Sequence, residues 1–305
     1  MRLKPYESLI VLNLIAYTLL RVGLGAEGFN FAGLEALAKH FVEPVFLCLW
    51  LWWLYRTYNL VRGRSGGIVK SIPAREYAFV LLMFFSYWSF SGLGADGKVD
   101  LIHQVNGHDM DAILIRADQS ILGFQPVQAL QAVIHPLLTF VLLESYIIAY
   151  LPLMILLMYV LHARGDEKEM ERFMTALVVA YTVARIIYFI VPAVGPETTL
   201  EYASDLGLCP SQMESLYGPV RDIDSTLRNT FPSLHIALSA IFLLNMRALR
   251  RWEKALVTSI VVMMWFSTLY LRMHYFVDVM AGWGLAAFSA WISPKLMSIG
   301  LKPSD

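Results

Sequence analysis

A possible nucleophile and a carboxylate that could orient it stand four positions apart near the end of the chain. They are His274 and Asp278, in the run YLRMHYFVD over residues 270–278. On a helix, residues at this spacing share one face and can touch. A carboxylate bound to one imidazole nitrogen fixes the tautomer and leaves the other nitrogen as nucleophile or base. The alternative is an ordinary polar contact inside a helix bundle.

A second cluster, RNTFPSLH over residues 228–235, ends on another histidine. Pro232 suits the first position of a helix, because its missing N–H would have no partner there. Ser233 and His235 then fall in the opening turn, where backbone donors and the helix dipole favour a phosphate group. Taken alone, the cluster also fits a helix cap with an incidental histidine.

Three arginines accompany these clusters. Arg185 lies inside an apolar segment, about two helical turns from its end, and a charge in that position usually faces a cavity. The alternative is that its long side chain snorkels to the interface. Arg228 and Arg272 stand in the two histidine clusters. Since arginine is the side chain best matched to phosphate oxygens, the combination favours chemistry on a phosphate group.

The elements that must position these residues are apolar helices. The chain of 305 residues is 57% hydrophobic and 16% charged, whereas an ordinary soluble domain carries about 25% charged residues. Its apolar runs approach the roughly 20 residues that a helix needs to cross a bilayer, where only helices satisfy an isolated backbone segment. The sequence therefore predicts an all-α, polytopic membrane bundle with about eight transmembrane helices. The expected spans are Ser8–Leu24, Phe41–Tyr58, Tyr77–Leu93, Pro136–Leu161, Phe173–Val191, Pro232–Leu249, Ala255–Leu271 and Phe276–Met297.

The distribution of Lys and Arg predicts the orientation of these spans. Most of the 24 basic residues fall in the loops on the side of the N-terminus, and basic loops stay in the cytoplasm. Both termini are therefore expected in the cytoplasm, and the histidine clusters on the other side. The protein is expected in a cell inner membrane or a membrane of the secretory pathway. A net charge of zero gives no sign of a nucleic acid partner.

Two long outer segments connect the expected spans. In Asp96–His135, an apolar stripe with helical spacing predicts a helix lying in the membrane interface. A re-entrant or partly soluble cap is an equal alternative. We expect residues 1–135 to form the N-terminal membrane helices with this interfacial helix, and residues 136–305 to form a catalytic helical core. The stripe is Met110, Ile113, Leu114, Ala117 and Ile121, and its expected polar face holds Asp109, Asp111, Asp118 and Gln119.

The motifs FPSLH and HYFVD resemble those of the type 2 phosphatidic acid phosphatase superfamily. Within it, the chain is most similar to inositol phosphorylceramide synthases and sphingomyelin-synthase-like lipid phosphotransferases. The resemblance extends from about Arg185 to Gly282. It implies catalysis by His274 as nucleophile, Asp278 as its orienting residue and His235 as the acid that protonates the leaving alkoxide. It also implies that the enzyme needs no metal or other cofactor.

The sequence departs from the superfamily pattern in its phosphate-binding residues. Arg185 can fill the lysine position, but Pro192 stands where an arginine is usual. Thr268 occupies the position of the arginine expected six residues before the nucleophile, and PSGH is here PSLH. Such departures are typical of the phosphotransferase branch and favour transfer over hydrolysis. The candidates for binding the phosphate are Arg185, Arg272, Arg228 and Ser233.

The sequence thus predicts a membrane enzyme that moves a phospho-headgroup from a lipid phosphoester to a polyol or lipid alcohol. A phosphatase acting on phosphatidate or on polyprenyl phosphate or diphosphate is the first alternative. A proton-relay transporter is the second, although it predicts charge at the bilayer midplane and not at helix ends. A scaffold with a vestigial site is the third. A metal site is disfavoured, because its candidate residues match no ligand frame; they are His103, His108, Asp109 and Asp111.

Overall fold

The computed structural model describes residues 4–23, 106–149, 153–154, 157–158, 160–161, 166–203, 205–209 and 228–300. The expected spans Phe41–Tyr58 and Tyr77–Leu93 lie outside these residues, as does His103. Over the described ranges the chain is helical and forms no strand, which confirms the all-α prediction for this part. An isolated bridge joins Ala193 and Asn229.

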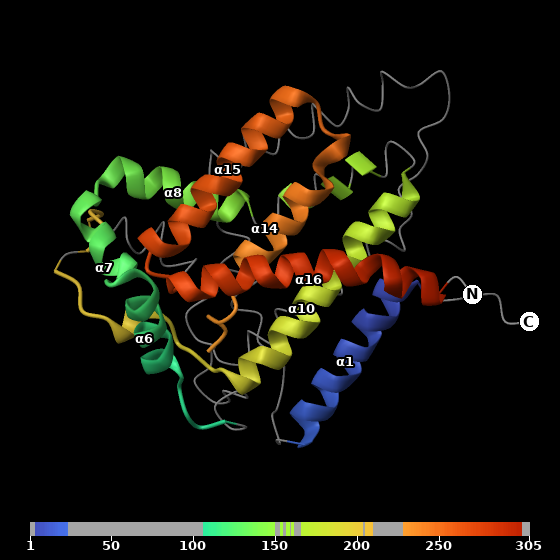
Figure 1. Cartoon of the computed structure of the whole chain (residues 1–305), viewed down its shortest axis with the longest axis horizontal. Helices are drawn as coiled ribbons and strands as arrows, with labels where there is room; N and C mark the ends of the chain where they lie inside the picture. Colours follow the sequence, from blue (N-terminus) through green and yellow to red (C-terminus); the bar gives the residue numbers. More distant parts are fainter. Residues whose placement is uncertain are drawn as a thin grey trace, which may run out of the picture.

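Seven helices carry the argument that follows (Figure 1). They are α1 (Pro5–Gly23), α6 (Asp111–Leu122), α8 (Pro136–Ile148), α10 (Glu167–Ile190), α14 (Leu234–Asn245), α15 (Arg251–Tyr270) and α16 (Phe276–Gly300). Between them lie the single turns α7 (Pro126–Ala129) and α11 (Pro196–Thr199) and the 3-10 turns η1 (Leu130–Val133) and η3 (Met246–Ala248).

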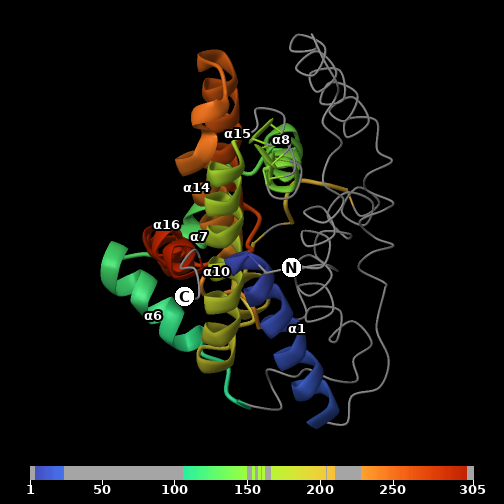
Figure 2. The same ribbon diagram turned by 90° about the vertical axis from the view of Figure 1, so that its right-hand side faces the viewer.

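Helix α16 is the centre of the packing. It packs against α10 and α14, while α15 packs against α8 and α1 lies along α10 (Figures 1 and 2). The core between them is made of apolar side chains such as Leu143, Phe173, Phe242 and Val261. Helix α6 lies outside this bundle and contacts α16. The arrangement brings the beginnings of α14 and α16, which hold the sequence motifs, into one region.

Among the described residues, two helices are long and apolar enough to cross a membrane, namely Glu167–Ile190 in α10 and Phe276–Ser298 in α16. Shorter apolar helices are found at Pro5–Ala16, Pro136–Tyr146 and Leu234–Asn245. The predicted span Pro232–Leu249 is therefore too long, because α14 gives way to a 3-10 turn after Asn245. Large apolar side chains are exposed along α16 and include Trp283, Phe288 and Trp291. These features are consistent with a membrane protein.

A turn between α15 and α16 holds the candidate nucleophile. The Thr268 carbonyl accepts hydrogen bonds from the backbone N–H groups of Met273 and His274, both at 3.0 Å. Arg272 lies within this turn at φ 65°, in the left-handed region that favours glycine. His274 consequently lies two residues before α16 begins. The prediction that His274 and Asp278 share a helix face is wrong, although the two side chains still meet.

Helix α6 confirms a helix within residues 96–135 but corrects its expected faces. Ile113 and Ile121 of the apolar stripe are 52% and 58% exposed, whereas Leu114 of the same stripe is buried. Asp111 and Asp118, however, are buried and do not form the expected water-facing side. Their carboxylates accept hydrogen bonds from backbone N–H groups of other segments, and this offsets the cost of burying them.

Candidate active site

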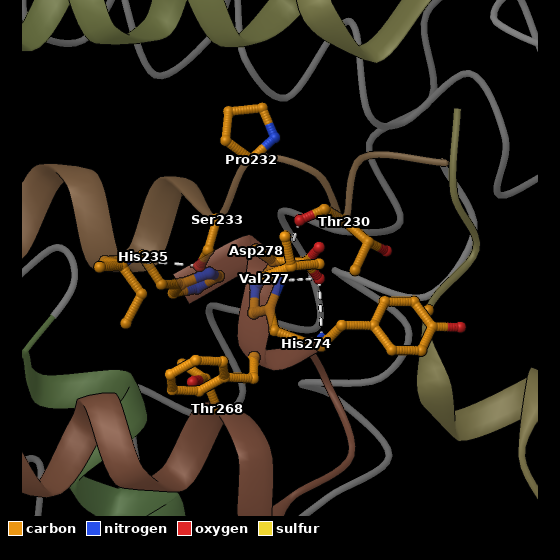
Figure 3. A network of polar contacts seen from close by, with 12 residues as sticks. Thr230, Pro232, Ser233, His235, Thr268, His274, Val277 and Asp278 are labelled. Atoms are coloured by element: carbon orange, nitrogen blue, oxygen red, sulfur yellow. Dashed lines mark hydrogen bonds and ion pairs between the residues drawn. The ribbon is translucent and has the colours of Figure 1, made fainter. Parts of the chain in front are cut away.

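His274 is buried beside the beginnings of α14 and α16 (Figure 3). Its Nδ1 atom lies 3.0 Å from the backbone carbonyl oxygen of Thr230 and 3.4 Å from Oδ2 of Asp278. Because a carbonyl oxygen only accepts, Nδ1 carries the proton in the neutral ring. The lone pair is then on Nε2, which is the nitrogen that can act as a nucleophile.

Asp278 is fully buried in the first turn of α16. Its Oδ2 atom accepts a hydrogen bond of 2.8 Å from the backbone N–H of Tyr275. Its backbone carbonyl accepts from the N–H of Ser233 at 3.2 Å, which joins the start of α14 to α16. A Cβ atom on Gly282 would lie 2.7 Å from the Ser233 carbonyl oxygen and 2.8 Å from Cβ of Ile236. Glycine at this position therefore permits the close approach of the two helices.

His235 lies in the first turn of α14 with its ring centroid 5.9 Å from that of His274. Its ring stacks on Tyr146 of α8 at 4.3 Å, and the Tyr146 hydroxyl lies 3.2 Å from Nδ1 of His235. The structure thus brings together all three members of the predicted catalytic set, His274, Asp278 and His235. Sequence reasoning missed Tyr146, which no motif marks within an apolar helix.

The predicted helix start at Pro232 is wrong by two residues, since α14 begins at Leu234. Ser233 is the N-cap residue, and its buried hydroxyl oxygen accepts from the N–H of Ile236 at 3.4 Å. The serine therefore stabilises the helix beside His235. Its predicted part in phosphate binding is not visible in this contact.

The three candidate arginines differ in their surroundings. Arg185 is buried in α10, the helix that packs against both α14 and α16. The buried Arg272 guanidinium lies 3.9 Å over the ring of Tyr202 and donates to the side-chain oxygen of Gln131. Burial raises the pKa of the Tyr202 hydroxyl, and the charge of Arg272 opposes this rise.

Arg228 is the first residue of the cluster over residues 228–235, and it pairs with Asp109. Its Nη2 atom donates to Oδ2 of Asp109 at 3.3 Å, and burial lowers the pKa of the guanidinium. For Arg228, as for Arg272, binding a phosphate would compete with the side-chain contact described above. Arg185 is the first candidate because it is buried in the helix that packs against both α14 and α16.

Two aspartates of α6 hold the segments around His274. Asp118 accepts from the backbone N–H groups of Phe276 at 2.9 Å and Val277 at 2.8 Å. Burial raises the pKa of its carboxyl, and these two hydrogen bonds oppose the rise. Asp111 accepts from Val194 at 3.0 Å and Gly195 at 2.8 Å. Their spacing on one helix face could have revealed a shared role, but no feature of the sequence indicated their partners.

The alternative metal site is not assembled in the part of the chain that the structure describes. Within it, no group of three or more His, Cys, Asp or Glu side chains could hold a metal ion. His108 and Asp109 are exposed, whereas Asp111 is buried against the backbone.

Comparison with known proteins adds one finding to this geometry. A family model described as the PAP2 superfamily matches residues 112–292, which is more than half of the chain. The matched region contains Arg185, His235, His274 and Asp278. Neither a curated protein nor a solved structure matches the chain.

Proposed function

The chain belongs to the PAP2 superfamily of phosphatases and phosphotransferases, and we propose that it transfers a phospho-headgroup from a membrane lipid to an alcohol. The observation that carries this proposal is the placement of two histidines, one at the start of α14 and one in the turn before α16. Their ring centroids lie 5.9 Å apart, and the Nδ1 atom of His274 is held by a carbonyl. The departures from the superfamily's phosphate-binding pattern support the branch of inositol phosphorylceramide synthase-like enzymes.

The reaction proceeds in two displacements on phosphorus. Nε2 of His274 forms a bond to phosphorus while the bond to the leaving oxygen breaks. Protonated His235 gives its proton to that oxygen. An incoming hydroxyl then loses its proton to His235 and attacks phosphorus, and the bond to His274 breaks. Asp278, 3.4 Å from Nδ1, stabilises the positive ring of the phosphohistidine.

We place the phosphate group near the start of α14. The first amides of α16 already bind the Asp118 carboxylate, so a second anion would be repelled there. Arg185, buried in the helix that packs against α14, supplies positive charge. Arg272 and Arg228 are further candidates that exchange their present contacts for the phosphate, and Ser233 contributes its hydroxyl proton.

In the membrane, we propose eight spans with both termini in the cytoplasm and the active site on the other side. The membrane is a cell inner membrane or one of the secretory pathway. Trp291 and Lys295, whose ammonium lies 3.3 Å over the indole ring, suit a cytoplasmic interface near the end of α16. The exposed isoleucines of α6 suit the outer interface. Residues 1–135 form the N-terminal helices with this interfacial helix, and residues 136–305 form the catalytic core.

The test is phosphoenzyme trapping with the purified full chain. A phospholipid labelled in its phosphate is incubated with the protein, with and without a polyol or a lipid alcohol as acceptor. We expect an acid-labile, base-stable label that is absent from His274→Ala and retained in His135→Ala, a control at an exposed histidine. Label on the acceptor indicates transfer, and release of label into water in its presence indicates a phosphatase. Persistent labelling of His274→Ala would overturn the mechanism.

A further inference from the structure

Helix α6 directs two carboxylates toward the rest of the molecule. Asp111 and Asp118 stand seven residues apart, which is about two helical turns, and so they share one face. Both are buried, and each accepts hydrogen bonds from two consecutive backbone N–H groups. A buried carboxylate is costly unless it is paired or hydrogen-bonded in this way. The four bonds tie α6 to two separate backbone segments.

Asp118 completes the cap of α16. The first amides of a helix have no partner within the helix and are usually bound by the side chain of the N-cap residue. Here the N-cap position is Tyr275, whose ring cannot accept these bonds. The N–H of Tyr275 is bound by Asp278, as in a capping box. The N–H groups of Phe276 and Val277 are bound by Asp118, a residue 158 positions away from the first and 159 from the second.

Asp111 binds the other side of the segment between α15 and α16, through the side chain of Tyr275. Its Oδ1 atom accepts from the Tyr275 hydroxyl at 2.8 Å as well as from the N–H of Gly195. A Cβ atom on Gly195 would lie 3.1 Å from Oγ1 of Thr230 and 3.3 Å from the carbonyl oxygen of Met273. The backbone at Val194 and Gly195, which Asp111 binds, therefore lies directly against Thr230. The carbonyl of Thr230 holds His274.

We propose that Asp111 and Asp118 are positioning residues, which hold the segment 273–278 so that His274 faces the phosphorus atom. Asp118 acts through the backbone N–H groups of Phe276 and Val277, and Asp111 acts through the Tyr275 hydroxyl and the backbone at Gly195. The inference rests on the proposed function, because the reaction at His274 is what the positioning serves. A displacement of about 1 Å at a reacting group can cost about 100-fold in rate. The loss of Asp118 should therefore affect the chemical step more than substrate binding.

The experiment compares Asp118→Asn and Asp118→Ala with Glu253→Gln. Glu253 is a matched control, because its buried carboxylate accepts from the backbone N–H of Arg250 at the start of α15. The burst of phosphoenzyme from an aryl phosphate is measured at saturating substrate, together with KM and the melting temperature. For Asp118→Ala we expect a burst rate lower by about 10- to 100-fold with KM within about threefold. Asp118→Asn should lie between, since its amide oxygen accepts one of the two bonds.

A second readout keeps the inference testable apart from the reaction. In protein labelled with ¹⁵N-histidine, the Nδ1 resonance of His274 should change in Asp118→Asn and stay constant in Glu253→Gln. Unchanged resonance and a burst rate equal to that of the Glu253 variant, in folded Asp118 variants, would overturn the inference. If the wild type forms no phosphoenzyme while the resonance still responds to Asp118, the proposed function fails and the positioning role stands.

Discussion

Replacing Asp278 by Asn removes a charge beside His274 while nearly preserving the size of the side chain. The amide oxygen can still accept from the N–H of Tyr275, which the Asp278 carboxylate now binds at 2.8 Å. The proton on Nδ1 of His274 also keeps an acceptor, because the Thr230 carbonyl lies 3.0 Å away. The substitution therefore isolates the electrostatic contribution of the carboxylate from its contribution to the tautomer.

The expected size of the effect follows from the separation of the charges. A phosphohistidine that keeps its Nδ1 proton is positive, and Oδ2 of Asp278 lies 3.4 Å from Nδ1. At an effective dielectric constant of about 20, two unit charges at this distance attract by about 5 kcal/mol. If roughly half of the charge has developed in the transition state, about 2–3 kcal/mol is lost, which corresponds to about 10²-fold in rate. The loss of about 10⁴-fold that follows a wrong tautomer is not expected.

The assay is the pre-steady-state burst of phenol from an aryl phosphate, compared with turnover of a lipid alkyl phosphate. Both should fall by the same factor, because the nucleophile serves both substrates. Glu253→Gln, a buried carboxylate-to-amide change at the start of α15, controls for loss of stability. A decrease of less than about threefold would refute the electrostatic role. A decrease of about 10⁴-fold would show that the Thr230 carbonyl does not hold the proton.

Four further predictions concern the acid, the cofactor and the membrane side. His235→Ala should lower turnover of an alkyl phosphate by about 10²–10⁴-fold. It should leave the labelling of the enzyme by an aryl phosphate intact. Tyr146→Phe keeps the stacked ring but loses the hydroxyl at 3.2 Å from Nδ1 of His235. It should reproduce this pattern with a loss of about tenfold in turnover of the alkyl phosphate. Equal losses for both substrates would contradict the assignment of His235 as the acid. Activity should survive exhaustive chelation. A loss that one metal restores would instead favour a metal site among residues 103–111. The exposed thiol of Cys209 should react with an impermeant reagent on intact cells. A Lys168→Cys thiol in a Cys209→Ser background should be protected from the same reagent. The reverse pattern would overturn the proposed orientation.

The sequence predicted the helical class and the meeting of the two histidine motifs, because long apolar runs and local motifs carry that information. It could not predict the residues that complete the site. Asp118 and Phe276 are 158 positions apart, and Tyr146 and His235 are 89 apart. Contacts over such separations depend on packing that no periodicity encodes.

The position of His274 shows a different limit. A spacing of four residues fits a helix, and no glycine or proline between residues 268 and 275 marks a turn. The chain turns there because Arg272 adopts a left-handed conformation in which arginine is uncommon. The same contact between His274 and Asp278 is then reached across a helix start and not along a helix face.

The contact at Gly282 also determines how far apart the two histidines stand. One histidine is carried by the start of α14 and the other by the turn into α16, and these starts are joined where Ser233 donates to Asp278. Since a Cβ atom at residue 282 would overlap the Ser233 carbonyl, the distance between the backbone segments that carry the acid and the nucleophile is set by backbone against backbone. The interface between these two helices thus limits the space for the group that reacts between the rings.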